Sequence, residues 1–312
     1  MSFAATLSLV LLASFGLCNL LLSTAVALSW RAGWLVRLIR ANAVLGVRLL
    51  PAAGSALLVF TIILPAFLLY EPSHAHDKPG ALLMLSAALA LLVLADGGRR
   101  GWQAWRATRA LVRRTPPLGT QSLGGGTEVS VVNVAEPLVA VVGGWRQRII
   151  AAGCVAAACD GEEFRQVIAH EAAHRDARDN LKRLALLAMP DVLAWLPAGG
   201  ALTAQWQAAT ELEADERASG ADPHKRLALA SALIKVARLS LARGRPHRTA
   251  TVSGHFGGLE HRVRRLLAPP SRNGPAFPGR RAMTSALLVP LLAMPLYALV
   301  HRVIEVLVAF GR

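Results

Sequence analysis

The run His170-Glu171-Ala172-Ala173-His174 combines two metal-ligand side chains with an acid at a helical spacing. On an α-helix, positions four apart lie one above the other, so His170 and His174 would present two imidazoles to one point. Hydrolytic zinc sites use three protein ligands and leave a fourth position for water. We therefore expect a Zn²⁺ cofactor, with Glu171 as the catalytic base that accepts a proton from water attacking a peptide carbonyl.

The histidines need a rigid helix to hold them. Asp160 can cap such a helix, and Glu163 three residues later completes a capping box. No Gly or Pro interrupts the pattern between Gly161 and Pro190, so we expect a long helix that carries the motif.

A second helix, roughly Ala201 to Ser219, ends at Gly220 and supplies acidic candidates for the third ligand position. We assign Glu211 as the third metal ligand. Asp215 follows one turn later on the same face and can orient a ligating histidine through its second ring nitrogen. Glu213 points elsewhere. The alternative is that these acids form only a solvated face of the helix.

Composition places the site in a membrane protein. Hydrophobic residues make up 54% of the chain, and the mean hydropathy is +0.43, too apolar for an ordinary soluble domain of this size. We expect a mostly α integral membrane protein with an α+β zinc-peptidase domain. Its four transmembrane helices would cover about 3–28, 53–70, 81–95 and 284–300.

The domain boundaries follow from these spans. Residues 1–96 would hold three spans, 97–282 the peptidase domain, and 283–312 the last span. The third span is short, at 81–95, and a buried soluble helix is its alternative. The fourth contains Pro290 and Pro295, which implies a kink. No Lys or Arg precedes the first span, unlike a cleaved signal peptide, so we expect it to be permanent.

Arginines between the apolar stretches predict the topology. The loop after the first span carries four arginines and no acid, and six more follow the third span. Positive loops face the cytoplasm, so the peptidase domain would be cytoplasmic and the loop 71–80 external. The arginines in question are Arg31, Arg37, Arg40 and Arg48, and then Arg99, Arg100, Arg106, Arg109, Arg113 and Arg114.

The formal charge of +15 does not indicate direct nucleic-acid binding. Much of the excess lies beside the spans, where it suits topology and anionic lipid, and Trp102 and Trp105 fit an interfacial collar. The lipid bilayer and a protein substrate are the expected partners.

Cys154 and Cys159 indicate no disulfide framework in a cytoplasmic domain.

Three short strands precede the motif helix in the expected cytoplasmic domain. They cover 128–134, 138–142 and 148–152, after a Gly-rich linker at 120–126. One of these strands can add an extended substrate to the sheet edge, and simple packing against the helix is an equal alternative. A further helix at 223–243 presents Leu227, Ala230, Leu233 and Ile234, which we interpret as core.

A family resemblance now joins these observations. The motif, the Arg178-Asp179-Asn180 run after it, the upstream Glu136-Pro137 and the Glu211/Asp215 spacing resemble the membrane metallopeptidases of the bacterial β-lactam sensor-transducers. The resemblance spans roughly 129–267. It implies a gluzincin-like zinc endopeptidase in the bacterial cytoplasmic (inner) membrane that inactivates a DNA-binding repressor, with His170, His174 and Glu211 as ligands. Self-cleavage stays open.

Two differences leave alternatives. The sequence stops at Arg312, shortly after the last expected span, so we expect no extracellular penicillin-binding sensor; any signal would enter through the spans, the outer loop or a partner. The pattern E-x-x-A-D at 211–215 is also similar to the proteases that include the CAAX prenyl protease and a heat-shock quality-control enzyme. A non-catalytic, zinc-bearing membrane receptor is a third interpretation.

The residue that would stabilise the oxyanion is not assigned. The candidates are His224, His247, His255 and Arg217.

Overall fold

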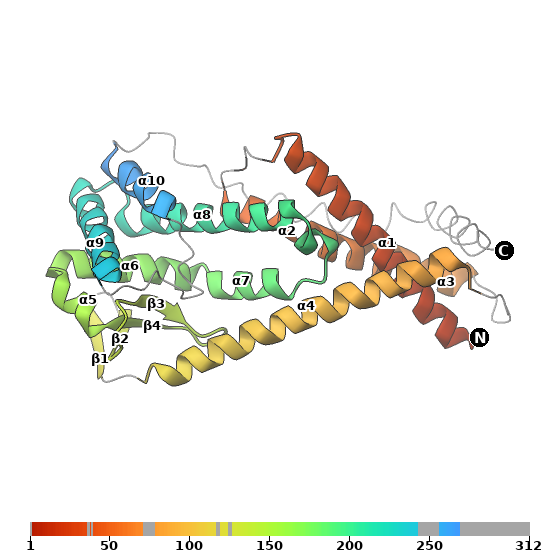
Figure 1. Cartoon of the computed structure of the whole chain (residues 1–312), viewed down its shortest axis with the longest axis horizontal. Helices are drawn as coiled ribbons and strands as arrows, with labels where there is room; N and C mark the ends of the chain where they lie inside the picture. The colour runs from red at the N-terminus through yellow and green to blue at the C-terminus, as the bar shows by residue number, and fades with distance from the viewer. Residues whose placement is uncertain are drawn as a thin grey trace.

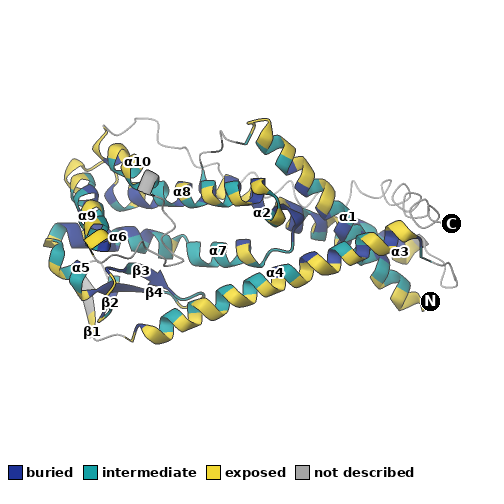
Figure 2. Ribbon diagram, in the orientation of Figure 1, coloured by how far each residue is buried: buried dark blue, intermediate teal, exposed yellow. Residues whose placement is uncertain are grey.

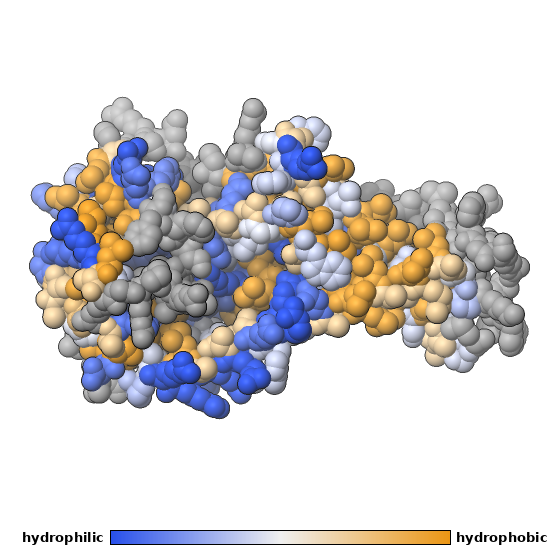
Figure 3. Space-filling model, viewed as in Figure 1, coloured by the Kyte–Doolittle hydropathy of each residue, from blue (hydrophilic) through white to orange (hydrophobic). Residues whose placement is uncertain are grey.

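The computed structural model describes residues 2–35, 38, 40–70, 79–116, 119–123, 127–242 and 256–268. Three long apolar helices gather at one end, and a four-stranded sheet with the shorter helices forms the other (Figure 1). Hydrophobic side chains dominate the surface of the first end, whereas hydrophilic ones are frequent over the second (Figure 3).

Three helices of the described chain are long and apolar enough to cross a membrane. They are α1 (Phe3–Arg31), the continuous helix Ala41–Leu69, and α4 (Ala81–Arg114). Leucines such as Leu21 and Leu85 are more than half exposed on their outer faces, as expected of a surface that meets lipid. The predicted fourth span at 284–300 lies outside the described residues.

The second of these helices begins earlier than predicted. α2 (Ala41–Leu58) starts at Ala41, whereas the sequence placed the start of the span at Ala53 and assigned Arg48 to a loop. Arg48 is 3% exposed and forms an ion pair with Asp191, which is fully buried. Its charge is therefore neutralised inside the protein, and the helix can include it.

The other spanning helices also differ from the predicted limits. α2 continues through a π-helical turn (Val59–Ile63) into α3 (Leu64–Tyr70). α4 runs unbroken to Arg114, so the helix that contains the predicted third span at 81–95 continues through the arginine-rich stretch after it, which is also good helix sequence. The expected boundary at 96/97 lies within α4, which continues past the spans toward the sheet (Figure 1).

The sheet has the strand order β1-β2-β4-β3. β2 (Thr127–Val132) pairs parallel with β4 (Arg148–Ala152), and β3 (Val139–Val142) pairs antiparallel with β4 and forms an edge. The prediction of a linker at 120–126 is wrong in part. β1 (Gly119–Leu123) pairs along β2, because backbone hydrogen bonds to a neighbouring strand can order a segment of weak strand propensity.

The motif helix packs on this sheet. α5 (Gly153–Ala158) leads from β4 into α6 (Gly161–Asp176), and Phe164 and Ile168 of α6 join Val129 and Ile149 of the strands in one buried cluster. β3 and β4 are almost wholly buried beneath the helices (Figure 2).

The chain then doubles back. α7 (Asp179–Ala188) and a 3₁₀ turn (Val192–Trp195) lead into α8 (Pro197–Ser219), which packs along α6. α9 (Pro223–Ala242) and α10 (Phe256–Leu267) complete the fold. The core face of α9 is the predicted one in part: Ala230 is buried and Leu233 packs against it, whereas Leu227 is 59% exposed. Leu229, which was not predicted, is buried in the same cluster as Leu266 of α10.

Candidate metal centre

The N-terminus of α6 is the predicted one. The Asp160 side chain accepts hydrogen bonds from the backbone of Glu162 and Glu163, and the Glu163 carboxylate accepts one from the backbone of Asp160. The C-terminus differs from the expected long helix. α6 ends at Asp176, and Arg178 adopts a left-handed conformation with φ of 55° before α7 begins.

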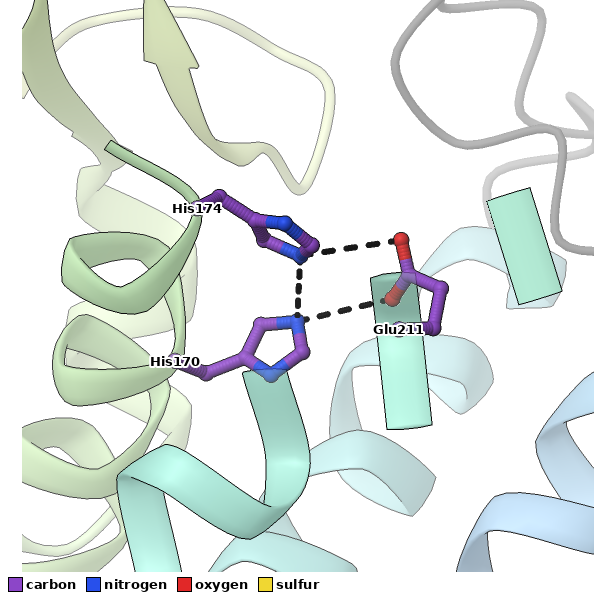
Figure 4. A group of neighbouring side chains, drawn as sticks. All are labelled: His170, His174 and Glu211. Atoms are coloured by element: carbon purple, nitrogen blue, oxygen red, sulfur yellow. Dashed lines mark hydrogen bonds and ion pairs between the residues drawn. The ribbon is translucent and has the colours of Figure 1, made fainter. Parts of the chain in front are cut away.

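Three side chains from α6 and α8 converge on one point (Figure 4). The Nε2 atoms of His170 and His174 lie 3.2 Å apart. Glu211 Oε2 lies 3.5 Å from Nε2 of His170, and Oε1 lies 3.7 Å from Nε2 of His174. The structure thus brings together the three residues that the sequence assigned as metal ligands, and this group can hold a metal ion.

The spacing of these atoms fits a tetrahedral zinc ion. Ligand atoms about 2.0 to 2.1 Å from zinc at tetrahedral angles lie about 3.3 Å from one another. The observed separations of 3.2, 3.5 and 3.7 Å are close to this value. Two imidazoles and one carboxylate are also the donor set of many catalytic zinc sites.

A carboxylate stands behind each histidine ring. Asp215 Oδ1 is 3.0 Å from Nδ1 of His170, at an angle outside good hydrogen-bond geometry, and Asp179 Oδ2 is 2.8 Å from Nδ1 of His174. With Nδ1 turned to a carboxylate, each ring directs Nε2 toward the shared point. Asp215 had been expected in this place. Asp179 had not, because it lies beyond the break at Arg178 and shares no helical face with His174.

Arg262 of α10 is a further site residue that sequence reasoning missed. Its guanidinium binds Asp215 through Nε (2.8 Å) and Nη2 (2.7 Å), and its Nη1 lies 2.8 Å from Glu211 Oε2. Arg226 of α9 donates hydrogen bonds to the backbone carbonyls of Leu266 and Ala268 and so fixes the end of α10. In the sequence, Arg262 is one of several arginines in a basic amphipathic segment, and no motif spacing distinguishes it from the others.

Burial and charge together shift the pKa values of this group. Burial opposes protonation of His170, but the Asp215 and Glu211 carboxylates outweigh it and raise its pKa to about 9. Burial opposes ionisation of Glu211, but His170 and Arg262 lower its pKa well below the usual range. Burial also opposes ionisation of Asp215, but its contacts with His170 and Arg262 outweigh burial and lower its pKa. Glu211 and Asp215 are therefore ionised at neutral pH, and zinc would bind by replacing a proton on His170.

Glu171 lies between the metal group and the edge of the sheet. Its Oε2 accepts a hydrogen bond from the backbone N–H of Val141 in β3 at 3.0 Å. Burial raises its pKa, against the lowering effect of the two histidines. A carboxylate with a raised pKa is a better proton acceptor than a free one, as general-base chemistry near neutral pH requires.

A cavity of about 550 Å³ opens at these residues. Its walls come from β3 and from helices α6 to α10, with apolar side chains of α9 such as Leu233 on one side. Arg262, Arg183 and Asn180 line it as polar donors. Of the proposed oxyanion donors that the structure describes, neither Arg217 nor His224 lines the cavity. Arg217 instead donates hydrogen bonds to the Glu213 carboxylate and to the Ala173 carbonyl. His247 and His255 lie outside the described residues.

The fold and site define a mostly helical protein with three potential membrane spans and a His-His-Glu group able to hold a metal ion. No protein-family model matches the chain, and no curated protein shows significant similarity to it.

Proposed function

We propose that the protein is a membrane-embedded, zinc-dependent endopeptidase that cleaves a cytosolic protein, such as a transcriptional repressor, in signal transduction. The observation that carries the proposal is the tetrahedral spacing of His170, His174 and Glu211, with Glu171 on the same helix. A structural zinc site would close its four positions with protein ligands, whereas three ligands leave one position for substrate chemistry.

His170, His174 and Glu211 would hold the zinc ion, which when bound supplies a Lewis acid that activates water and polarises a peptide carbonyl. The protein groups do the rest. Glu171, fixed by the Val141 amide, receives the proton of the attacking water and passes it to the leaving amine. Asp179 and Asp215 hold the ligand rings in place.

The edge strand β3 favours a polypeptide substrate. Both backbone groups of Val141 point away from β4: its N–H donates to Glu171, and its C=O accepts from Asn180 at 2.9 Å. The same edge continues through Val139 of β3, which also lines the cavity. An extended chain added alongside this edge would pass directly beside Glu171.

Contacts between α8 and the first interhelical loop support a cytoplasmic site. Gln205 of α8 donates to the Leu35 and Leu38 carbonyls, so this loop lies on the same side of the bundle as the metal group. This loop carries Arg37 and Arg40, follows Arg31 and lacks acids, which favours a cytoplasmic side by the positive-inside tendency.

The test compares newly formed protein N-termini in cells that produce the wild type, Glu171→Ala or Glu162→Ala. Glu162 is on the exposed face of α6 and serves as a matched control. The proposal expects cuts in a cytosolic regulator with the wild type and the control but not with Glu171→Ala. Cuts confined to misfolded membrane proteins would instead support a quality-control or prenyl-protein-type protease. Identical profiles in all three would refute proteolysis and favour a non-catalytic receptor.

A further inference from the structure

The segment 189–196, here called the connector, joins the two halves of the metal group. α6 and α7 precede it, and α8, which carries Glu211, follows it. Any shift of the connector changes the placement of α8 relative to the histidines. The middle of the connector is buried: Val192 is 7% exposed, and Asp191 and Leu193 are fully buried.

α1 holds the connector through uncharged side chains. The Asn19 amide donates to the Pro190 carbonyl at 3.0 Å and accepts from the Val192 amide at 2.9 Å. Ser23 accepts from the backbone N–H of Leu193 at 3.1 Å. Asn19 and Ser23 are fully buried in a helix that has no charged residue before Arg31. Polar groups buried in a spanning helix are costly, and these are used to bind one short segment.

α2 holds it through a charge. Arg48 Nη1 lies 2.9 Å from Asp191 Oδ2, while Asp191 Oδ1 accepts a hydrogen bond from the Ala194 amide. Within the described part of the chain, the buried Arg48 Nε has no hydrogen-bond partner. An incompletely satisfied buried ion pair is a poor source of stability compared with apolar packing, but it does specify one geometry.

α4 closes the third side. Trp195 donates from its indole to Asp96 at 3.0 Å, and Arg100 donates to the Met189 carbonyl at 3.0 Å. Gly97 allows the close approach, because a Cβ there would lie 2.8 Å from the Ala188 carbonyl oxygen. α1, α2 and α4 thus all contact one segment of eight residues.

A second contact joins α2 directly to α8, the helix that carries Glu211. The backbone N–H of Ala41, at the start of α2, donates to Glu213 Oε1 at 2.9 Å. Glu213 lies two residues from Glu211 along α8. α2 therefore binds the segment before α8 through Arg48 and the middle of α8 through its own N-terminus.

We propose that Arg48 and Asp191 are positioning residues through which the spanning bundle sets the distance between Glu211 and the two histidines. The inference rests on the proposed zinc site. Rearrangement of the spans would move the connector, change that distance, and so change zinc affinity and proteolysis. The bundle is then the element through which a membrane signal acts on the site.

The experiment measures zinc affinity by chelator competition, and thermal unfolding, in purified full-length protein. The test variant is Arg48→Leu/Asp191→Leu, which removes both charges without leaving one unpaired. The matched control is Arg165→Leu/Glu162→Leu, which removes an exposed ion pair of α6. Arg48→Lys keeps the charge and should retain most of the affinity.

The inference expects the double variant to unfold near the wild-type temperature while zinc affinity falls by about tenfold, as for losses that act through ligand orientation. Unchanged zinc affinity in a folded double variant overturns the inference and leaves the proposed function standing. A wild type that binds no zinc overturns both. If the double variant does not fold, Asn19→Ala, which removes two uncharged contacts to the connector, takes its place with the same two outcomes.

Discussion

Replacement of Asp215 by Asn should weaken zinc binding without unfolding the protein. Asp215 is 4% exposed, lies 3.0 Å from Nδ1 of His170 and is bound by Arg262 at 2.7 and 2.8 Å. The substitution keeps the shape but removes the charge that orients the ring. It also weakens the hold of residue 215 on Arg262, whose Nη1 lies 2.8 Å from Glu211 Oε2, so that Arg262 competes more strongly with the metal for Glu211.

The expected loss is 10- to 100-fold in zinc affinity, which corresponds to about 1.4 to 2.7 kcal/mol. Competition with a chromophoric chelator at fixed pH and ionic strength measures it. Glu216→Gln is the matched control, because Glu216 is the next residue of α8, is exposed, and has its carboxylate 3.8 Å from the Arg265 guanidinium, away from the metal group. Equal affinities of wild type and Asp215→Asn, or an equal loss in the control, would refute the assigned role.

Three further predictions concern stability. Removing zinc with a chelator should lower the unfolding temperature, because a ligand at 1,000 times its Kd stabilises by about 4 kcal/mol; an unchanged temperature would contradict a bound metal. Burial opposes ionisation of Glu163, but its contacts with Lys235 and Ser231 lower its pKa below the ordinary 4.5, so its stabilising effect is present above pH 4.5 and is lost as the pH falls through the lower folded value. Glu163→Gln should cost about 1 to 3 kcal/mol at pH 7 and flatten the acid limb of the stability curve measured by urea unfolding. Gly199→Ala should cost about 1 to 3 kcal/mol, because its Cβ would collide with the Leu193 carbonyl, whereas Gly200→Ala, which faces open space, should not destabilise.

The sequence predicted those parts of the site that depend on local geometry. His170 and His174 meet because four residues make about one helical turn, and Asp160 and Glu163 start their helix through a capping box that involves only neighbours. Glu211 and Asp215 share a face of α8 for the same reason. Their meeting with the histidines was inferred from chemistry alone.

The remaining features depend on contacts between distant segments. Asp179 reaches His174 only because Arg178 adopts a left-handed conformation without a glycine to announce it. Arg262 is placed by packing of α10 on α8 and α9. Arg48 looked like a loop arginine because its partner, Asp191, lies 143 residues away in the chain. Charge alone could not distinguish a cytoplasmic loop from a buried ion pair.

The most direct test of the account is the zinc content of the purified full-length protein, measured by atomic emission, for the wild type, Glu211→Ala and the control Glu216→Ala. The account predicts about one zinc ion per chain in the wild type and the control, and a clear loss in Glu211→Ala. A wild type without zinc, or a Glu211→Ala variant that keeps it, would contradict the proposed metal centre.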